Sequence, residues 1–441
     1  MSTYPSNGQL YSPGITRISV SGFKSLANRT DVEIRPLTIL AGANSSGKSS
    51  AMQPLLLMKQ TLESAFVPAG PFLLSGPHTR YTETAQFLSQ VEAEPRLDLE
   101  FQLGRQVSVG FGFADDTRGS FDVSETRVSS DPQFHPWRIR RDSTSEYLRS
   151  IDPLMASVTA HKALPTLFAS RFKYYFSILA TSDVNSETFA FEPREISALN
   201  FQIRKMIHVQ GLRGDQNRKW LLADVQAHGT FEGSFESYVP SLILKWQHEV
   251  LGLESSALDE SLSLLGLASS VQARILNESE VEVHVPRTLD SDASDFVNIA
   301  DVGLAVSTVL PVLVALIQAD PEQLVYIEQP ELHLHPKAQF LVAQLLVRAA
   351  NRGVRVVIET HSSLLLRGIL TEVAKGSISN DKVMLHWFER DKTTGISKVI
   401  SKEPDSAGRV GDWPEDFSDV ELSSDNDYLN AVEGKLFAAK K

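Results

Sequence analysis

The residues with the clearest chemistry form the segment Gly42-Ala43-Asn44-Ser45-Ser46-Gly47-Lys48-Ser49-Ser50. It fits the pattern G-x-x-x-x-G-K-[S/T] at every fixed position, and its glycines let successive backbone N–H groups surround a phosphate. In this pattern Lys48 reaches the β- and γ-phosphates of a nucleotide, and the Ser49 hydroxyl binds Mg²⁺. The alternative is an ordinary Gly/Ser turn. The segment therefore predicts a site for a nucleotide and a magnesium ion.

The flanking sequence supplies the elements that this pattern needs. Residues 36–41 form an apolar run that is typical of a buried strand, and residues 51–62 form an apolar-rich stretch that is typical of a helix. A glycine-rich turn between such elements points the helix N-terminus at the phosphates. Pro54 lies inside the expected helix and predicts a kink or a shifted start.

A second buried strand is expected at residues 323–327, and Glu328 follows it directly. A carboxylate at the end of an apolar strand is costly unless a cation or hydrogen-bond donors meet it, so we interpret Glu328 as a partner of Mg²⁺. The next turn, QPELHLHP, places Glu331, His333 and His335 beside the site. The spacing E-x-H-x-H leaves a zinc site as an alternative, which the phosphate-binding segment upstream disfavours.

A third strand is expected at residues 354–358, followed by Glu359-Thr360-His361-Ser362. A histidine at the exit of a strand in the same sheet can hydrogen-bond the γ-phosphate or the attacking water. His361 is therefore a candidate for that role. The alternative is a structural or helix-capping histidine, because Thr360, Ser362 or Ser363 can begin the next helix.

Composition excludes several other kinds of protein. The chain has 441 residues, 42% of them hydrophobic and 22% charged, which fits a soluble globular protein of two or three domain-sized units. The absence of cysteine excludes disulfides, thiolate catalysis and Cys-ligated zinc or iron–sulfur sites. The net charge of −12 argues against general attraction to nucleic acid. With no signal pattern and no apolar run of membrane-spanning length, we expect a cytoplasmic protein that does not enter a membrane.

The expected elements divide the chain into four parts. Residues 1–115 and 291–400 carry the motifs described above. From residue 296 strands alternate with helices, which predicts a parallel sheet with both faces covered, whereas residues 72–113 contain short β-like runs. Residues 116–290 form an inserted lobe, mainly helical or mixed, and residues 401–441 form a C-terminal extension. Within these last two parts we expect helices at 164–180, 235–250, 258–267 and 427–436, a helix or a helix followed by a strand at 196–209, and a strand at 279–286.

Taken together, strand–GANSSGKSS–helix, LVYIEQPELHLHP and VVIETHSSLLL resemble the ABC-type ATPase heads of the SMC and OLD (overcoming lysogenization defect) class. The chain also resembles bacterial AAA family ATPases with IEQPELHLHP and a C-terminal GDWPEDF-like segment, and it resembles them more closely than the SMC and OLD heads. The stretches ISVSGFKSL and HVQGLRGD also resemble that group, so the similarity covers most of the chain. It implies an α/β P-loop NTPase fold of the ABC-ATPase head type, with a mixed sheet and flanking helices.

The resemblance implies roles for single residues. Glu328 corresponds to the Walker B acid that handles Mg²⁺, and His361 to the switch histidine. A signature segment, here residues 300–307 with Gly303 and Ser307, would place a helix N-terminus at the γ-phosphate of a partner subunit's nucleotide. Plain helix capping is the alternative for this segment. ATP and Mg²⁺ are the implied cofactors, and a homodimer or higher homo-oligomer is the implied assembly.

One position departs from the family pattern. Gln329 stands where a catalytic glutamate is usual. Glutamine cannot accept a proton from the attacking water, although it can orient it. Either Glu331 serves as the base, or the protein acts mainly as an ATP-bound clamp. We expect slow hydrolysis with Glu331, Gln329 and His361 as the catalytic group, and a substitution that traps ATP is a further alternative.

Two local basic clusters could contact nucleic acid. Trp137 lies beside Arg138, Arg140 and Arg141, and the second cluster contains Arg213, Arg218 and Lys219. An aromatic ring beside arginines suits a phosphate backbone, yet solvated surface charge is the commoner explanation. Arg213, between glycines, could instead serve the nucleotide or an interface.

These observations favour an ATP-binding and slowly ATP-hydrolysing switch that dimerises and controls a separate effector, a nuclease or toxin. This arrangement resembles anti-phage systems of the Septu or PARIS kind. OLD-class relatives carry a C-terminal nuclease domain, and we expect none here because few residues follow the last expected strand. The alternatives are a non-hydrolysing ATP-gated scaffold and a DNA-clamping ATPase of repair or chromosome maintenance.

Overall fold

The structure is a computed structural model. It describes residues 14–91, 95–116, 119–129, 136–151, 166–181, 188–211, 213, 217–225, 229–288 and 295–411. Within these residues the chain is α/β, as the sequence predicts, and its strands form four sheets. The predicted helix at 427–436 and the GDWPEDF-like segment from residue 412 onward lie outside the described residues.

A six-stranded sheet forms the centre of the molecule, in the order β11-β16-β17-β3-β18-β19. The strands β11, β16, β17, β3 and β18 are parallel, and β19 is antiparallel to β18. In the same order their bounds are Ile207–Val209, Leu324–Glu328, Arg355–Thr360, Leu37–Gly42, Val383–Arg390 and Ser397–Lys402. The carboxyl ends of parallel strands meet at one edge, so the residues that follow β3, β16 and β17 lie together.

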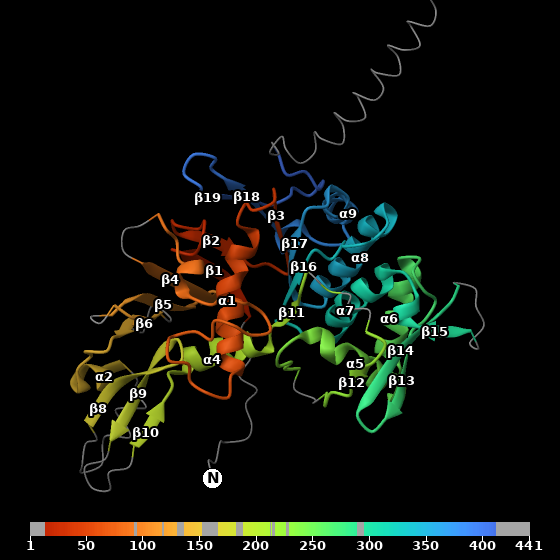
Figure 1. The fold of residues 1–441 in the computed structure, drawn as a ribbon. Coiled ribbons are helices and arrows are strands. Elements are labelled where there is room, and N and C mark those ends of the chain that lie inside the picture. Colours follow the sequence, from red (N-terminus) through yellow and green to blue (C-terminus); the bar gives the residue numbers. More distant parts are fainter. Residues whose placement is uncertain are drawn as a thin grey trace, which may run out of the picture.

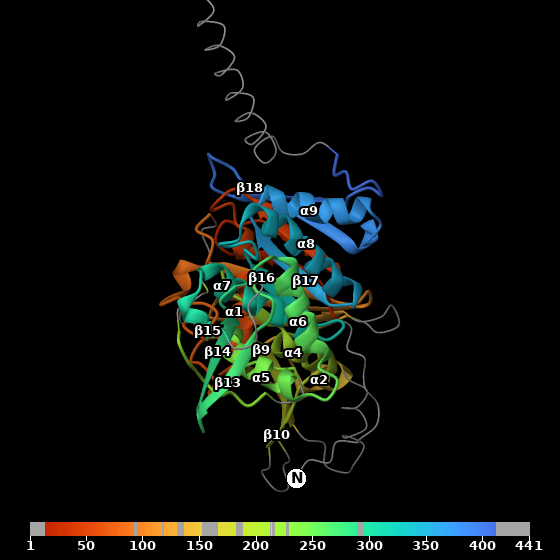
Figure 2. The same cartoon turned by 90° about the vertical axis from the view of Figure 1, so that its right-hand side faces the viewer.

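Helices cover one face of this sheet, and a single long helix lies on the other. Helices α7 (Leu304–Gln318), α8 (Pro336–Asn351) and α9 (Ser363–Ala374) form the cover that Figures 1 and 2 show. Helix α1 (Lys48–Glu63) packs between the central sheet and a second, antiparallel sheet (Figure 1). It begins at Lys48 and continues through Pro54, so the proline does not delay its start.

The antiparallel sheet runs in the order β2-β1-β4-β5-β6-β7. Its strands in that order are Thr30–Glu33, Ile15–Ser21, Arg96–Leu103, Val107–Asp115, Phe121–Ser129 and Trp137–Ile139. Strand β4 alternates between buried and partly exposed residues because one face packs on α1 and the other carries charge. The pairing of β5 with β6 crosses residue 115, so the expected boundary there falls inside a sheet.

The prediction of a helix at residues 164–180 is wrong. This segment forms a hairpin of β8 (Thr166–Phe172) and β9 (Tyr175–Thr181), and β10 (Thr188–Phe191) pairs with β9. Phe172 pairs with Tyr175, and Lys173 in the turn between them has φ +54°. The aromatic residues that suggested a helix face are also strong strand formers, and a two-residue turn with positive φ joins them into a hairpin.

The other expected elements of residues 116–290 are confirmed. Helices α4, α5 and α6 span Arg194–Lys205, Val239–His248 and Leu253–Leu264, and a short α2 spans Ser145–Ile151. Strand β14 (Glu280–Pro286) pairs with β12 (Trp220–Leu221), β13 (Gln272–Asn277) and β15 (Phe296–Asn298). Since β15 lies beyond residue 290 and β11 belongs to the central sheet, residues 116–290 do not form a separate unit.

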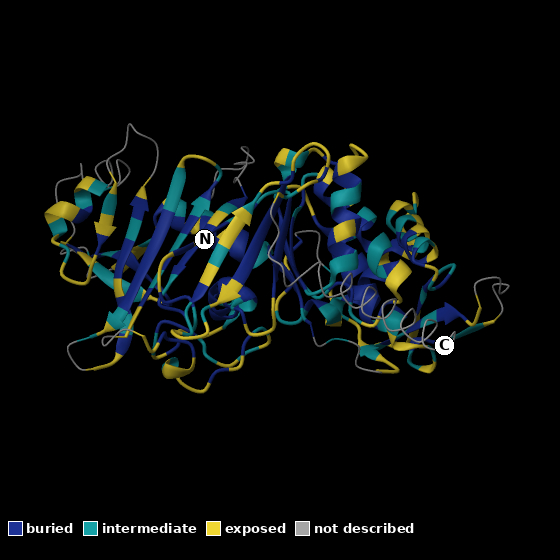
Figure 3. Cartoon of the chain, turned by 90° about the horizontal axis from the view of Figure 1, so that it is seen from above, coloured by how far each residue is buried: buried dark blue, intermediate teal, exposed yellow. Residues whose placement is uncertain are grey.

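The central strands are among the most buried parts of the molecule, as the dark blue ribbons of Figure 3 show. One apolar core lies on the α7–α8 side and includes Ile39, Val325 and Ile358. Another lies on the α1 side and includes Leu40 and Tyr326. Because side chains alternate along a strand, the residues that share the α1 side with Tyr326 include the polar ones discussed next.

Candidate nucleotide-binding site

The segment 42–50 connects β3 to α1 through a loop that requires glycine. Gly42 has φ +142° and Gly47 has φ +101°, in the region that favours glycine. A Cβ atom at Gly47 would lie 2.6 Å from Ser397 Oγ and 2.8 Å from Ser25 Oγ. Ser397 Oγ also donates a hydrogen bond to the Ser46 carbonyl at 2.5 Å. Strand β19 and the ISVSGFKSL segment therefore support the loop from outside.

The Lys48 side chain lies inside this loop. Its ammonium donates to the carbonyl of Gly42 at 3.1 Å and to that of Ala43 at 2.8 Å. Burial lowers the pKa of Lys48, and the negative charge of Glu359 opposes that change. Residues 43–45 are exposed, whereas Ser46, Lys48 and Ser50 are buried. The loop thus exposes residues 43–45 to solvent and holds a cation in its interior.

Ser49 contacts an acid that the sequence analysis did not select. Its hydroxyl donates to Glu359 Oε1 at 2.9 Å, and the Tyr326 hydroxyl donates to Glu359 Oε2 at 3.0 Å. Burial raises the pKa of Glu359, although the Ser49 hydrogen bond opposes this. A signal was present in the sequence: Glu359 lies near the end of a buried strand, and that strand is the direct neighbour of β3.

Glu328 lies opposite Glu359 in the register of β16 and β17. It accepts hydrogen bonds from His208 Nε2 and from the Gly211 backbone N–H, each at 3.0 Å. Burial by itself raises the pKa of Glu328, but the His208 hydrogen bond and charge, the Gly211 amide and the Arg213 charge together lower it. The expected Mg²⁺ partner is therefore held as a carboxylate, one strand farther from the loop than Glu359.

Glu331 and His361 join the turn after β16 to the phosphate loop. Glu331 Oε1 accepts from Thr360 Oγ1 at 2.7 Å and from the His361 N–H at 3.2 Å. Glu331 Oε2 is buried without a hydrogen-bond partner among the described residues, and burial raises the pKa of this carboxyl. The His361 side chain hydrogen-bonds the Gly42 backbone; burial and the Lys48 charge lower its pKa. The three predicted segments thus meet at one place.

Gln329 is held by its backbone. It has φ +47°, and its N–H donates to the Glu359 carbonyl at 2.7 Å. Arg213 donates to the carbonyls of Glu328 and Gln329 at 2.5 and 2.6 Å and to that of Thr308 in α7 at 2.7 Å. Burial lowers the pKa of Arg213 to about 10. Of the alternatives for Arg213, the structure favours a role at the site over nucleic-acid contact.

The segment predicted as a signature lies at the start of α7. Gly303 is exposed and precedes the first helical residue, and no side chain among the described residues caps this helix end. Ser307 Oγ donates to the Leu304 carbonyl at 3.0 Å within the first turn. The Val306 N–H donates to the Gly303 carbonyl at 3.4 Å, and no described side chain competes with an external acceptor for the N–H groups of this terminus.

The histidines of QPELHLHP do not form a metal site. His333 and His335 are exposed, and His335 caps α8 by accepting from the Lys337 N–H at 3.3 Å. Across the described ranges, no group of three or more His, Cys, Asp or Glu residues could hold a metal ion. The zinc alternative therefore finds no support in this part of the chain.

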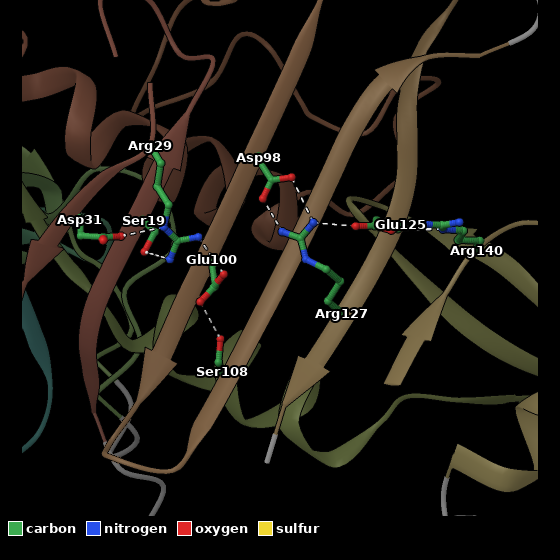
Figure 4. Close-up of polar contacts among 9 residues, drawn as sticks. All are labelled: Ser19, Arg29, Asp31, Asp98, Glu100, Ser108, Glu125, Arg127 and Arg140. Carbon is green, nitrogen blue, oxygen red and sulfur yellow. Dashed lines mark hydrogen bonds and ion pairs between the residues drawn. The ribbon is translucent and has the colours of Figure 1, made fainter. Parts of the chain in front are cut away.

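Most of the basic residues considered for nucleic acid are paired with acids. Figure 4 shows Arg140 at Glu125 on the outer face of the antiparallel sheet, where Arg127 also bridges Glu125 and Asp98. The further ion pairs are Arg141 with Asp122, Arg218 with Asp301 and Lys219 with Glu280. Arg138 is exposed on β7. These pairs neutralise much of the positive charge on which the nucleic-acid alternative rests.

No helix among the described residues is long and apolar enough to cross a membrane. No curated protein sequence matches this chain. Three solved SMC head domains are similar over most of their lengths and at low identity. The first, bound to the C-terminal winged-helix domain of ScpA, is 11% identical with a TM-score of 0.46, over 90% of this chain and 99% of its own.

The second, from Thermotoga maritima, is 10% identical with a TM-score of 0.39, over 88% of this chain and 98% of its own. The third, from Pyrococcus furiosus and bound to the C-terminal domain of ScpA, is 10% identical with a TM-score of 0.42, over 89% of this chain and 96% of its own. A family model matches residues 37–367, which include every segment of the site described above. The chain therefore belongs to the family described as "AAA domain, putative AbiEii toxin, Type IV TA system", and its fold is that of a P-loop ATPase.

Proposed function

We propose that the protein is an ATP-dependent switch that binds Mg²⁺–ATP at the phosphate loop, dimerises around it and hydrolyses it slowly. One observation carries this proposal. The Ser49 hydroxyl, which is the Mg²⁺ ligand of a phosphate loop, lies 2.9 Å from Glu359 Oε1, and Glu328 stands opposite Glu359 on the next strand. Two carboxylates and a hydroxyl are the oxygen donors that Mg²⁺ prefers.

The residues present fit a bound nucleotide. Buried Ser46 Oγ and Glu331 Oε2 have no hydrogen-bond partner among the described residues, and such atoms are normally satisfied. Residues 43–45 are exposed and directly precede the N-terminus of α1, where anions bind. When bound, Mg²⁺ would neutralise charge on the phosphate oxygens. Lys48, Ser49 and Glu359 would hold the phosphates and the ion, with Glu328 positioned through water.

Hydrolysis is assigned to Glu331, with Gln329 and His361 in supporting roles. The unpaired Glu331 Oε2 can accept a proton from a water molecule, and burial raises the pKa of this carboxyl, which suits a general base. Gln329 can orient that water but cannot deprotonate it. His361, at the Gly42 backbone, can hydrogen-bond the terminal phosphate.

Dimerisation is assigned to the open N-terminus of α7. Gly303 is exposed and Leu304 is 40% exposed, although α7 is otherwise among the most buried helices. A nucleotide bound on one subunit could receive the backbone N–H groups of the partner's α7. ATP would then shift the monomer–dimer equilibrium by its differential affinity for the two states.

The switch is assigned to the control of a separate effector in bacterial anti-phage defence. The family description names a toxin of a toxin–antitoxin system, and the motifs resemble those of defence ATPases. The effector would be a nuclease or a toxin on another chain in the cytoplasm. This assignment rests on family membership and analogy, whereas the ATP site rests on geometry.

Light scattering tests the switch. The molar mass of the wild type should rise from monomer to dimer when ATP and Mg²⁺ are added together, and Lys48→Ala should stay monomeric. Lys375→Ala, which removes an exposed lysine of the C-terminal end of α9, is the matched control and should dimerise like the wild type. A molar mass that is the same for all three proteins in every condition contradicts the proposal.

A non-hydrolysing ATP-gated scaffold is the second candidate, and Gln329 favours it because the usual carboxylate is absent. Single-turnover hydrolysis separates the two candidates. Product formation by the wild type that is lost in Glu331→Gln supports the slow ATPase. ATP-dependent dimerisation without any product supports the scaffold.

A further inference from the structure

A chain of buried polar side chains leads from Glu328 to the far end of α1. His208 Nε2 lies 3.0 Å from Glu328 Oε1, and His208 Nδ1 lies 3.1 Å from His78 Nδ1. His78 Nε2 is 3.4 Å from Glu63 Oε2, and Lys59 Nζ is 2.6 Å from Glu63 Oε1. The side chains of His78, His208 and Lys59 are each only 1% exposed. Of these residues, the nucleotide site described above includes Glu328 and its hydrogen-bond partner His208, whereas His78, Glu63 and Lys59 lie beyond it.

At the Glu328 end of this series of side chains, the contacts hold both acids of the site, Glu328 and Glu359. The His208 ring stacks on the Tyr326 ring with a centroid distance of 5.3 Å and an interplanar angle of 8°. His208 contacts Glu328, and Tyr326 donates to Glu359. The ionised Glu328 accepts the His208 Nε2–H, and only one of the two facing Nδ1 atoms can donate to the other, so the histidines fix each other's tautomers.

At the end away from Glu328, this series of polar side chains contacts residues of the segment 229–238. Lys59 Nζ donates to the carbonyls of Arg204 and Phe231 at 3.0 and 3.2 Å. Glu63 Oε2 accepts from the Gly233 N–H at 3.1 Å. Phe231 packs edge-on against Phe235, which begins the helical region leading into α5. The chain therefore joins the nucleotide site to the entry of the lobe that contains α5, α6 and β12–β14.

Packing alone does not account for this set of residues. Burying two carboxylates, an ammonium and two imidazoles costs free energy, and apolar side chains of the same volume often stabilise a protein more. Glu328, His208 and His78 are joined by hydrogen bonds, and Lys59 pairs with Glu63, whereas His78 Nε2 and Glu63 Oε2 lie 3.4 Å apart without a hydrogen bond. The geometry of these buried groups depends on their neighbours. A change in the position of Glu328 therefore changes the positions of the other side chains in this series.

We propose that His208 is a positioning residue of the nucleotide site, and that His208 and His78 couple the position of Glu328 to the segment 229–238. His208 orients Glu328 toward Mg²⁺, as hydrogen-bond partners of metal ligands commonly do. When Glu328 moves to meet the ion, His208, His78, Glu63 and Lys59 adjust with it. The segment 229–238 then responds to nucleotide occupancy. This inference rests on the proposed ATP site and names the route by which it reaches the lobe.

Two substitutions of His208 separate positioning from coupling, because glutamine places its amide where Nε2 lies and asparagine where Nδ1 lies. His208→Gln keeps a donor for Glu328 and loses the contact with His78. We expect it to bind Mg²⁺–ATP within about threefold of the wild type. His208→Asn loses the donor for Glu328, and we expect its Mg²⁺–ATP affinity to fall about 10–100-fold, with ATP binding in EDTA little changed.

Hydrogen exchange of the peptide covering residues 229–248 measures the coupling. In the wild type, Mg²⁺–ATP should change the exchange rate of this peptide; in His208→Gln and in His78→Asn at least half of that change should be lost. His78→Asn is remote from the nucleotide, so it keeps the test decisive if His208 variants fold poorly. His386→Gln is the control. His386 is a fully buried histidine of β18 that contacts Ser401 and the Glu33 carbonyl, and it does not belong to the series of side chains from Glu328 to Lys59.

The outcomes distinguish the inference from the function on which it rests. If the wild type binds Mg²⁺–ATP but exchange in residues 229–248 does not respond, the coupling is overturned and the ATP site stands. If His208→Asn binds Mg²⁺–ATP as the wild type does, the positioning role is overturned. If the wild type binds no ATP, both proposals fail. Equal losses in His386→Gln and His208→Gln would show a general packing defect and also overturn the coupling.

Discussion

Ser49 Oγ lies 2.9 Å from Glu359 Oε1 although the two residues are 310 positions apart in the chain. The contact joins the phosphate loop to the neighbouring strand at the carboxyl end of the central sheet, because Ser49 is the second residue of α1, which follows β3, and Glu359 is the last residue but one of β17. It brings a hydroxyl of the phosphate loop to a buried carboxylate. The account of an Mg²⁺–ATP site begins with this pair.

Glu359→Gln should weaken Mg²⁺–ATP binding more than ATP binding in EDTA. Loss of one carboxylate from a magnesium site lowers metal affinity, and we expect a decrease of about 10–100-fold in the presence of Mg²⁺. Glu328→Gln should act in the same direction through its water-mediated position. Calorimetric titration of each variant with ATP, with Mg²⁺ and with EDTA, checks this. Equal losses in both conditions would assign Glu359 a structural role only.

Glu331→Gln should lower the rate of hydrolysis by about 100-fold or more, because general-base catalysis contributes about 10²–10⁴-fold. Its ATP affinity should stay close to that of the wild type, since Glu331 holds the Thr360 hydroxyl and the His361 N–H, which glutamine can also do through its carbonyl. Single-turnover assays measure the rate. Hydrolysis by Glu331→Gln at the wild-type rate would move the base to another residue.

Gly47→Ala should destabilise the phosphate loop. The new Cβ would meet Ser397 Oγ at 2.6 Å at a backbone φ of +101°, and strain of this kind costs about 1–3 kcal/mol. Denaturant unfolding should show that loss, and ATP binding should fall with it. Gly70→Ala is the matched control, because no atom of the described part of the chain lies within 4 Å of its Cβ position. Similar losses in both variants would remove the steric argument.

Asp259→Asn should stabilise the protein at neutral pH. Burial raises the pKa of Asp259 from 3.8 to about 6, although the Val271 N–H bond opposes this. The folded state therefore binds the proton more tightly than the unfolded state, and the stability it contributes is present below pH 4 and lost as the pH rises through 6. At pH 7.5 the variant should gain about 1–2 kcal/mol in unfolding free energy, since Asn also accepts from Val271.

Chemical denaturation at pH 7.5 and pH 4 measures this gain, which should shrink at the lower pH. Glu254→Gln in the first turn of the same helix is the control, with an expected change below about 0.5 kcal/mol at both pH values. A gain for Asp259→Asn that is the same at pH 4 and 7.5 would contradict the role of ionisation.

The phosphate loop and its strands were predictable because their signals are local. The segment 42–50 has fixed spacing, and the apolar runs before Glu328 and Glu359 define buried strands. The hairpin at 166–181 was not predictable from its composition, since aromatic residues suit a helix face and a strand equally and the turn at Lys173 carries no glycine.

Which side chains contact Glu328 and Glu359 depends on the order of the strands in the sheet, and no local sequence pattern encodes that order. Sequence alone selected Glu328, although Glu359 also follows an expected strand directly, and Glu359 became a candidate only when β17 was seen between β3 and β16. In the same way, His78 and His208 are 130 positions apart and meet only in the fold. The ion pairs of Arg140 and Arg141 are likewise long-range contacts, so their sequence cluster predicted more free charge than exists.

The central claim is that residues 42–50, Glu328 with Glu331, and Glu359 with His361 form one site for Mg²⁺–ATP. Calorimetric titration of the wild type and Lys48→Ala with ATP in the presence of Mg²⁺ tests it most directly. We predict saturable binding by the wild type and a loss of about 100-fold or more in Lys48→Ala, because two charge-assisted bonds contribute about 1.5–3 kcal/mol each. No binding by the wild type, or equal affinity in Lys48→Ala, would contradict it.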